Sequence, residues 1–372
     1  MDPQTVFCPN LDCLARGQTG KGNIHVHSLK EHRYLCDVCD KTFSETKGTV
    51  FYRLRTDTEQ VTLVLALLAH GCPVCAIVFA FGLDERTVRD WEQRAGHHSE
   101  QVHQHLVQQP RDLGQVQADE IRVKMQTLVV WLAMALQVST RLWLGAVISE
   151  HRDETLVSAL MQRVRACALC RPLLFCVDGF RAYLGAIHTV FREPIPPRPI
   201  GRPQLRPWDG IHIAQVVKQY AHGHVIGVVR RIVQGTVAQV NRLVQTSQGD
   251  GVINTAYIER LNATFRARLA GLVRRGRSLL QQTETLQVGV YLVGTIYNFC
   301  TYHESLRVPL YVGRAGRTHW VPRTPAMAAG ITDHLWSVSE LLRYQVPPSR
   351  WTPPQHRGRP SQAAKELINK WC

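Results

Sequence analysis

The chain has 372 residues, 45% of them hydrophobic, with a formal net charge of +15 and a pI near 9.6. This length is enough for two or three domains with a real core, and the charge predicts a polyanionic partner, most simply nucleic acid. An anionic membrane surface is the rival partner, but we expect no membrane association, because the chain shows no signal peptide at its start and no apolar stretch of membrane-spanning length.

Residues 1–55 are expected to form a small metal module. Eleven cysteines occur in the chain, and the first four fall into a C-x4-C pair and a C-x2-C pair around a glycine-containing loop. Without a secretion signal we expect a reducing, cytoplasmic setting, where metal binding is favoured over disulfides. Four thiolates satisfy tetrahedral Zn²⁺, so the spacing predicts a structural zinc ribbon, with four reduced cysteines in a loop as the alternative. The expected ligands are Cys8, Cys13, Cys36 and Cys39. Histidines between the pairs are lower-ranked ligands: His25, His27 and His32.

Residues 56–98 are expected to contain three short helices. Gly71 stops the first, Gly82 ends the second, and Asp84 is a suitable N-cap for the third. Helix, glycine turn and basic helix are typical of a helix-turn-helix whose last helix enters the DNA major groove. A plain three-helix packing unit, with Val88 and Trp91 inward in either case, is the alternative. The side chains expected to contact DNA are Arg86, Thr87, Arg89, Gln93 and Arg94.

Two features of this region are expected to be structural. Cys72 and Cys75 are interpreted as small core residues rather than a second metal site. The histidine-rich run that follows, with residues 99–113 as its approximate extent, is interpreted as a helical linker. A metal role for its histidines is disfavoured because no cysteine or carboxylate cluster accompanies them.

Residues 114–310 are expected to form a mixed α/β domain. Strand-like runs cover 116–124, 129–139 and 142–149, followed by an amphipathic helix over 154–168 and a buried strand over 173–177. This β-β-β-α-β order is the layout of ribonuclease-H-like nucleotidyl transferases. A strand pair over 215–233 and a long helix over 283–303 behind the sheet complete the expected domain.

Two stretches are expected to lie outside that core. Residues 191–210 are rich in Pro and Arg and are interpreted as an inserted basic loop, either tracking a phosphate backbone or simply solvated. Residues 311–372 are interpreted as a C-terminal extension, flexible from Pro347 onward.

Three acids stand out as candidate metal ligands. Asp119 lies on the first expected strand, Asp178 follows the fourth, and Glu259 lies on a helix that leads into six arginines with no acid between Arg260 and Thr283. Two strand acids and one helix acid can bind two Mg²⁺ or Mn²⁺ ions for phosphodiester chemistry. The alternatives without a metal role are an ordinary strand-end acid at Asp119 and a simple Asp-Gly turn at Asp178.

Other acids are ranked lower. Glu120 neighbours Asp119 but is expected to point to the opposite face of the strand. Asp209 and Asp250 are loop acids, and Asp250 lies between glycines.

Together these motifs resemble the DDE transposases of the insertion-sequence-one family. The resemblance rests on Ile258-Glu-Arg-Leu-Asn-Ala-Thr-Phe-Arg-Ala-Arg, preceded by Asp119-Glu and Val177-Asp-Gly-Phe-Arg-Ala-Tyr, and it covers most of residues 5–305. The family's founding members divide these parts between two reading frames, whereas here they lie in one chain. The resemblance implies a zinc ribbon, a helix-turn-helix and a ribonuclease-H-like catalytic domain.

Site roles follow from the resemblance residue by residue. Asp119, Asp178 and Glu259 correspond to the catalytic metal ligands. Arg266, two helical turns after Glu259, corresponds to a basic position that contacts DNA near the scissile phosphate, and Asn262 corresponds to the family asparagine. Asn262 is also expected to bind DNA, and phosphate contacts are expected from the arginine-rich segment: Arg260, Arg266, Arg268, Arg274, Arg275 and Arg277.

The function expected from these observations is DNA transposition. The protein would bind the terminal inverted repeats of an insertion sequence, cut at the element's 3′ ends and join them to target DNA. It would act on double-stranded DNA as at least a dimer, in the bacterial cytoplasm and on the nucleoid. A DNA-binding regulator without catalysis and a structure-selective nuclease of the same fold are the alternatives.

Overall fold

The computed structural model describes residues 1–195, 204–222, 224–249, 251–273, 279–312, 317–353 and 360–371. It is a mixed α/β protein that divides into two compact units. One unit combines residues 1–60 with 342–372, and the other comprises residues 61–341. Within the described segments, no helix has both the length and the apolar character needed to cross a membrane.

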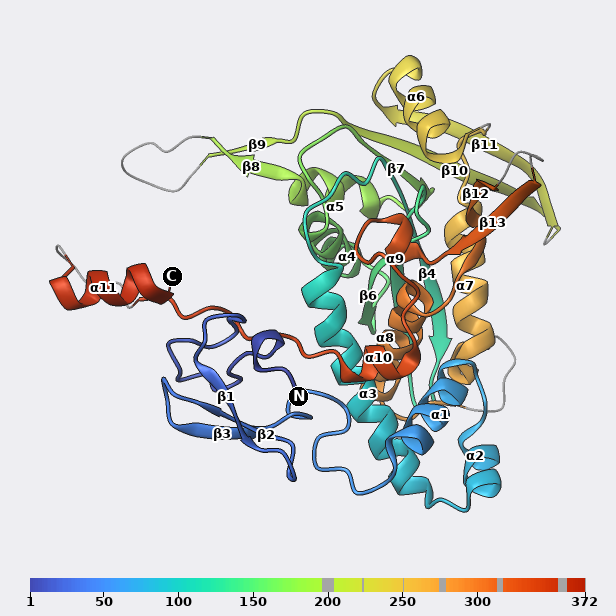
Figure 1. Ribbon diagram of the computed structural model, residues 1–372. Coiled ribbons are helices and arrows are strands. Elements are labelled where there is room, and N and C mark those ends of the chain that lie inside the picture. The colour runs from blue at the N-terminus through green and yellow to red at the C-terminus, as the bar shows by residue number, and fades with distance from the viewer. Residues whose placement is uncertain are drawn as a thin grey trace. The chain divides into compact units, whose positions relative to one another are not determined.

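The smaller unit is built on a three-stranded antiparallel sheet, as Figure 1 shows. Its strands are β1 (Ile24–Ser28), β2 (Arg33–Cys36) and β3 (Lys41–Ser44), after the short 3-10 helix η1 (Pro3–Thr5). Tyr34 and Phe43 stack with ring centroids 5.7 Å apart. The buried cluster of this unit consists of these rings, three cysteines and a few other apolar side chains, so it holds very little apolar volume.

The C-terminal segment packs on this same unit. Gln345 donates to the carbonyls of Glu45 (2.7 Å) and Lys47 (2.9 Å). The last helix, α11 (Gln362–Trp371), brings Trp371 into the cysteine-containing cluster, where it is 5% exposed. The tail expected to be flexible from Pro347 onward therefore contributes, in its described parts, to the core of the N-terminal module.

The larger unit begins with three helices: α1 (Thr58–Ala69), α2 (Val74–Phe81) and α3 (Glu85–Leu106). The predicted helix boundaries at Gly82 and Asp84 are confirmed. Gly82 ends α2 with φ of 63°, and the Asp84 side chain accepts from the backbone N–H groups of Arg86 and Thr87 at the start of α3. Val88 and Trp91 are buried, as expected.

The third helix is longer than predicted, because the histidine-rich run continues α3 without a break. His98 and His103 are buried and contact the backbone carbonyls of Leu341 and Leu144. Gly96 allows α3 to approach α8 (Thr283–Phe299) so closely that a Cβ there would overlap Val288, and Figure 1 shows the two helices together. The expected linker is thus a core element.

The cysteine pair in this region departs from its prediction. Cys72 is half-buried and Cys75 is exposed, so neither is a core residue. Both flank the start of α2, where the chain has just turned at Gly71, and both line an open pocket rather than the core.

Among the described residues, the central sheet has six strands in the order β11-β10-β7-β4-β5-β6. The predicted β-β-β-α-β order is present: β4, β5 and β6 form an antiparallel meander, α4 (Glu154–Ala166) follows, and β7 pairs parallel to β4. The strands are β4 (Gln115–Lys124), β5 (Val129–Gln137), β6 (Trp143–Ser149), β7 (Leu173–Asp178), β10 (Ile211–Ala221) and β11 (His224–Gln234).

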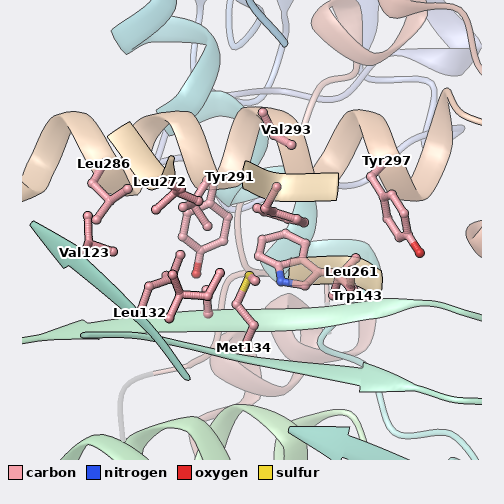
Figure 2. Packing of buried hydrophobic residues seen from close by; sticks show 14 of the residues in the cluster. Val123, Leu132, Met134, Trp143, Leu261, Leu272, Leu286, Tyr291, Val293 and Tyr297 are labelled. Atoms are coloured by element: carbon pink, nitrogen blue, oxygen red, sulfur yellow. The ribbon is translucent and has the colours of Figure 1, made fainter. Parts of the chain in front are cut away.

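Helices cover both faces of this sheet (Figure 1). One face carries α4 and α5 (Ala182–Val190), and the other carries α6 (Val237–Gln248), α7 (Ala256–Arg268) and α8. Figure 2 shows the core on the second face, where Met134 and Leu132 of the sheet, Trp143 of β6 and Tyr291 of α8 pack together. This core holds α7 against the sheet and thereby positions Glu259.

Several shorter elements complete the chain. Helix α6 and the hairpin over residues 303–323 were not anticipated from the sequence. The Pro/Arg-rich stretch contains a small hairpin in its described parts; residues 196–203 lie outside the described residues. These elements are β8 (Arg192–Pro194), β9 (Leu205–Pro207), η2 (Ala270–Leu272), β12 (His303–Val312), β13 (Arg317–Arg323), α9 (Pro325–Ala328) and α10 (Val338–Arg343).

Candidate metal centres

The described part of the chain contains two groups of side chains that could hold a metal ion. The first is the cysteine set predicted from the spacing: Cys8, Cys13, Cys36 and Cys39, with all four sulfurs within 4.8 Å of one another. The Sγ atoms of Cys8 and Cys39 are 3.7 Å apart, and those of Cys13 and Cys36 are 3.8 Å apart. A tetrahedral Zn²⁺ with Zn–S bonds of about 2.3 Å requires S–S separations of about 3.8 Å. The cysteine group therefore fits zinc, and its sulfurs are too far apart for disulfides.

The buried surroundings of these sulfurs disfavour free thiolates. Burial raises the pKa of the Cys13 thiol to about 11 and raises that of Cys8 further. Asn23 donates from its Nδ2 to the Cys36 sulfur at 3.3 Å. A bound divalent ion would stabilise the thiolates that burial disfavours.

Two of the histidines ranked as alternative ligands have other partners. The imidazole of His25 lies 2.6 Å from Asp37, and that of His32 lies 3.1 Å from Glu45.

The second group consists of Asp119, Glu120 and Asp178, with one oxygen of each within 4.8 Å of the others. Asp119 and Asp178 also line a pocket of about 470 Å³ in the larger unit. Glu259 of α7 lines the same pocket, so the structure brings the three predicted acids to one pocket from three elements, although Glu259 is not part of the closely spaced group. Parallel pairing of β7 with β4 brings Asp178 beside Asp119, because the register joins Cys176 to Gln117 two residues earlier. Glu259 reaches the pocket from the first turn of the helix packed on that face.

Asp119 is the most buried of the three acids. Asn262, one turn after Glu259 on α7, donates from Nδ2 to Asp119 Oδ2 at 2.7 Å. Burial, followed by the charges of Glu120, Asp178 and Glu259, raises the pKa of Asp119 to about 7. Asn262 is only 2% exposed, so it orients the carboxylate from inside the protein and is not placed to touch DNA.

Glu120 belongs to the acidic group, although the sequence analysis ranked it low. It does leave β4 on the face opposite Asp119, where Tyr183 of α5 donates to its carboxylate. One of its oxygens nevertheless lies within 4.8 Å of an oxygen of Asp119 and one of Asp178. Oxygen donors at this spacing suit a hard cation such as Mg²⁺.

Arg152 joins these acids and was not identified from the sequence. Its Nη2 lies 2.8 Å from Glu120 Oε2 and 3.1 Å from Asp178 Oδ2, and its guanidinium lies over the Phe180 ring at 4.2 Å. The residue sits in the short connection between β6 and α4, where one arginine gives no periodic or motif signal.

Lys218 is a second residue of the pocket that was not identified as a site residue from the sequence. It lies on β10, and its Nζ is 2.7 Å from Glu259 Oε1, while Thr255 donates to the same oxygen at 3.0 Å. The pocket and the adjoining Glu120 thus set two cationic side chains against four carboxylates.

The residues predicted to contact DNA fall into several environments. On α3, Arg89 pairs with Glu85 and Arg94 with Asp90, Gln93 donates to Glu284, Arg86 is exposed and Thr87 is half-buried. On α7, Arg260 is exposed, whereas Arg266 and Arg268 are half-buried. The other arginines of that prediction lie outside the described residues: Arg274, Arg275 and Arg277.

Comparison with known proteins does not assign this chain to a family. The chain matches no protein-family model, and no curated protein matches it.

Proposed function

We propose that this protein is a metal-dependent DNA transposase of the DDE type, resembling the insertion-sequence-one family. The observation that carries the proposal is the meeting of Asp119, Asp178 and Glu259 in one pocket. The β-β-β-α-β order of the sheet, with Asp119 in the middle of β4 and Asp178 at the end of β7, agrees with the ribonuclease-H-like layout. The net charge of +15 supports a nucleic-acid substrate.

Asp119, Asp178 and Glu259 would hold the catalytic Mg²⁺ or Mn²⁺, with Glu120 close behind them. When bound, two such ions activate an attacking oxygen and stabilise the leaving 3′-oxygen of a phosphodiester. The chain's own residues prepare the acids: Asn262 fixes Asp119, and Arg152 fixes Asp178. Water and then the freed 3′-OH would be the successive attacking groups, with no covalent protein intermediate.

The remaining parts of the chain supply DNA-binding elements in this proposal. The four-cysteine module would be a zinc ribbon, and α2 and α3 a helix-turn-helix that together recognise the terminal inverted repeats. Because two ends must react together, the active form would be at least a dimer. The ion pairs of Arg89 and Arg94 on α3 would open or be shared when phosphates approach.

The test is a cleavage and strand-transfer assay with Mg²⁺ on DNA from the ends of the element that carries this gene. Wild type should nick at the 3′ end and join the labelled 3′-OH to target DNA. Glu259→Gln should abolish both products while DNA binding persists, because the variant loses a ligand charge without losing its volume. Glu304→Gln is the matched control, since Glu304 is exposed and pairs only with Arg307 in the described structure.

The outcomes separate the alternatives. Nicks without joined products would favour a nuclease that uses the same acids. DNA binding without products in wild type would favour a regulator, and equal activity of wild type and Glu259→Gln would reject the acidic pocket as the active centre.

A further inference from the structure

Helix α7 presents two different polar faces, one on each side of its buried stripe. Ile258, Leu261 and Phe265 form that stripe and pack into the core. Glu259 lies on one side of it, facing the acidic pocket. Tyr257 lies on the other side, about 160° away from Glu259 at 100° per residue.

The face that begins at Tyr257 is basic. Arg260 and Arg268 follow at spacings of three and eleven residues, which place all three side chains along one stripe. Arg141, from the turn between β5 and β6, lies over the Tyr257 ring at 3.9 Å. Tyr297 of α8 donates its hydroxyl to the Arg141 carbonyl at 3.1 Å, and Figure 2 shows Tyr297 at one end of the core cluster.

Arg141 is held in a strained backbone conformation. Its φ is 58°, in the left-handed region that residues other than glycine adopt at a cost of about 1 kcal/mol or more. Its guanidinium also donates to the Val138 carbonyl. The turn therefore holds this arginine in place before any ligand arrives.

Positive charge gathers here without a balancing acid. Within the described residues, no ion pair joins Arg141, Arg260 or Arg268 to a carboxylate. His303, at the start of β12, contacts the Tyr297 ring at 4.6 Å. Burial and then the charges of Arg260, Arg268 and Arg141 lower the pKa of His303 to about 4.

Two buried polar atoms of this cluster have no hydrogen-bond partner: Nη1 of Arg268 and Nε2 of His303. Such atoms cost free energy unless a ligand or water satisfies them. The two nitrogens themselves are out of a ligand's reach. The exposed Arg260, the absence of an acidic partner for the three arginines among the described residues and the turn that holds Arg141 together indicate a site for an anion, with Arg268 and His303 behind it.

We propose that Arg141, Arg260, Arg268 and His303 form a binding site for a backbone phosphate of DNA, separate from the phosphate that reacts at the acidic pocket. Arg260 is exposed and would make the first contact, with Arg141 beside it on Tyr257. This inference rests on the proposed function for the identity of the polyanion. It adds Arg141 and His303 to the DNA-contacting residues expected from the sequence.

The dimensions agree with a nucleic-acid backbone. From Glu259 to Arg268 the helix rises about 13 Å, the length of about four base pairs of duplex. A helix about 10 Å across is narrower than the DNA it would face, so one duplex can reach both sides of α7. The acidic side would hold the reacting phosphate, and the basic side would hold another.

The test is DNA binding without added Mg²⁺, so that no catalysis is needed. Fluorescence anisotropy of a labelled duplex should show that Arg260→Gln weakens binding by about tenfold. The slope of log affinity against log salt should fall by about 0.9, the contribution of one phosphate contact. Arg260→Lys should keep most of the slope, because it keeps the charge.

Arg242→Gln is the matched control, since Arg242 is an exposed arginine on α6 of the same unit. A second readout is the pKa of His303 followed by NMR, which should rise on DNA binding because a phosphate offsets the arginine charges. Circular dichroism of each variant checks that folding is unchanged.

The site is rejected if Arg260→Gln binds DNA like wild type, if it loses no more affinity than Arg242→Gln, or if the His303 pKa does not move. Those results leave the catalytic proposal standing. If binding depends on Arg260 but wild type gives no cleavage, the phosphate site stands and the transposase proposal fails. Absence of any DNA binding by wild type would reject both.

Discussion

Lys218 and Glu259 meet in the acidic pocket although they are 41 residues apart in the chain, with Nζ 2.7 Å from Oε1. Lys218 comes from β10, and Glu259 comes from α7 on the face of the sheet that carries the pocket. Hydrogen bonding to Glu259 raises the pKa of Lys218, so the ammonium stays charged at neutral pH. A cation that binds Glu259 must share this carboxylate with Lys218 or displace it.

Lys218→Met is therefore expected to tighten metal binding. The two side chains are 38% and 46% exposed, so the ion pair is worth less than about 1 kcal/mol. Mn²⁺ affinity measured by calorimetry should rise by up to about fivefold, with little change in the free energy of unfolding. Arg307→Met breaks an exposed ion pair with Glu304 outside the pocket, and it should leave the Mn²⁺ affinity unchanged. Weaker Mn²⁺ binding in Lys218→Met would show that Lys218 supports the metal site.

Arg152→Gln is expected to destabilise the larger unit. The Glu120 side chain is fully buried, and Arg152 is its cationic partner. Removing one partner of a buried ion pair costs about 3 kcal/mol in the free energy of unfolding at neutral pH. Urea denaturation should also show that the loss shrinks as the pH falls, because burial raises the pKa of Glu120 and protonation removes the unpaired charge. The double variant Arg152→Gln with Glu120→Gln should recover most of the loss; no recovery would contradict this role.

Without a metal ion, the protein is expected to lose stability as the pH rises from about 4 to about 7. The pKa of Asp119 is raised from 3.8 to about 7, so the folded state binds a proton that the unfolded state releases in this range. At about 1.4 kcal/mol per pKa unit, the loss is at most about 4 kcal/mol. Asp119→Asn should flatten the pH profile of thermal unfolding, and Mg²⁺ binding near pH 7 should release a proton. A profile equally steep in wild type and variant would contradict the assignment.

Zinc is expected to be required for the fold of the smaller unit. Its buried cluster is small and includes three of the four cysteines, so a chelator should unfold the unit and expose Trp371, which lies in that cluster. Metal analysis should give one Zn²⁺ per chain, and Cys36→Ser should lose it, whereas Cys300→Ser, outside the cysteine group, should keep it.

The same unit should also depend on its C-terminal helix. Trp371→Ala leaves a cavity beside the cysteine group and should cost about 3 kcal/mol, measured as faster zinc release to a colorimetric chelator. Unchanged release would show that the C-terminal helix does not stabilise the zinc site.

Features set by residues close together in the chain could be predicted from the sequence. Asp84 and Gly82 mark helix ends because a side-chain cap and a left-handed glycine act within a few residues. The cysteine spacing anticipated a group whose sulfurs do come together, and the alternation of apolar residues anticipated β4 to β7. The acids Asp119, Asp178 and Glu259 could be named as a set because each stands at a recognisable place on a strand or helix.

Other features were decided only by tertiary contacts. Trp371 completes the N-terminal module across more than three hundred residues, as its carbonyl's bond to Gln18 illustrates. His103 belongs to the core because α3 packs beside Trp143, not because of any pattern near it. Arg152, Lys218 and Arg141 carry no periodic signal, since a single charged residue in a loop or strand acquires a role from the partners that folding brings to it. Residue types and short-range spacing determined which chemistry this chain carries, whereas long-range packing decided which charges meet.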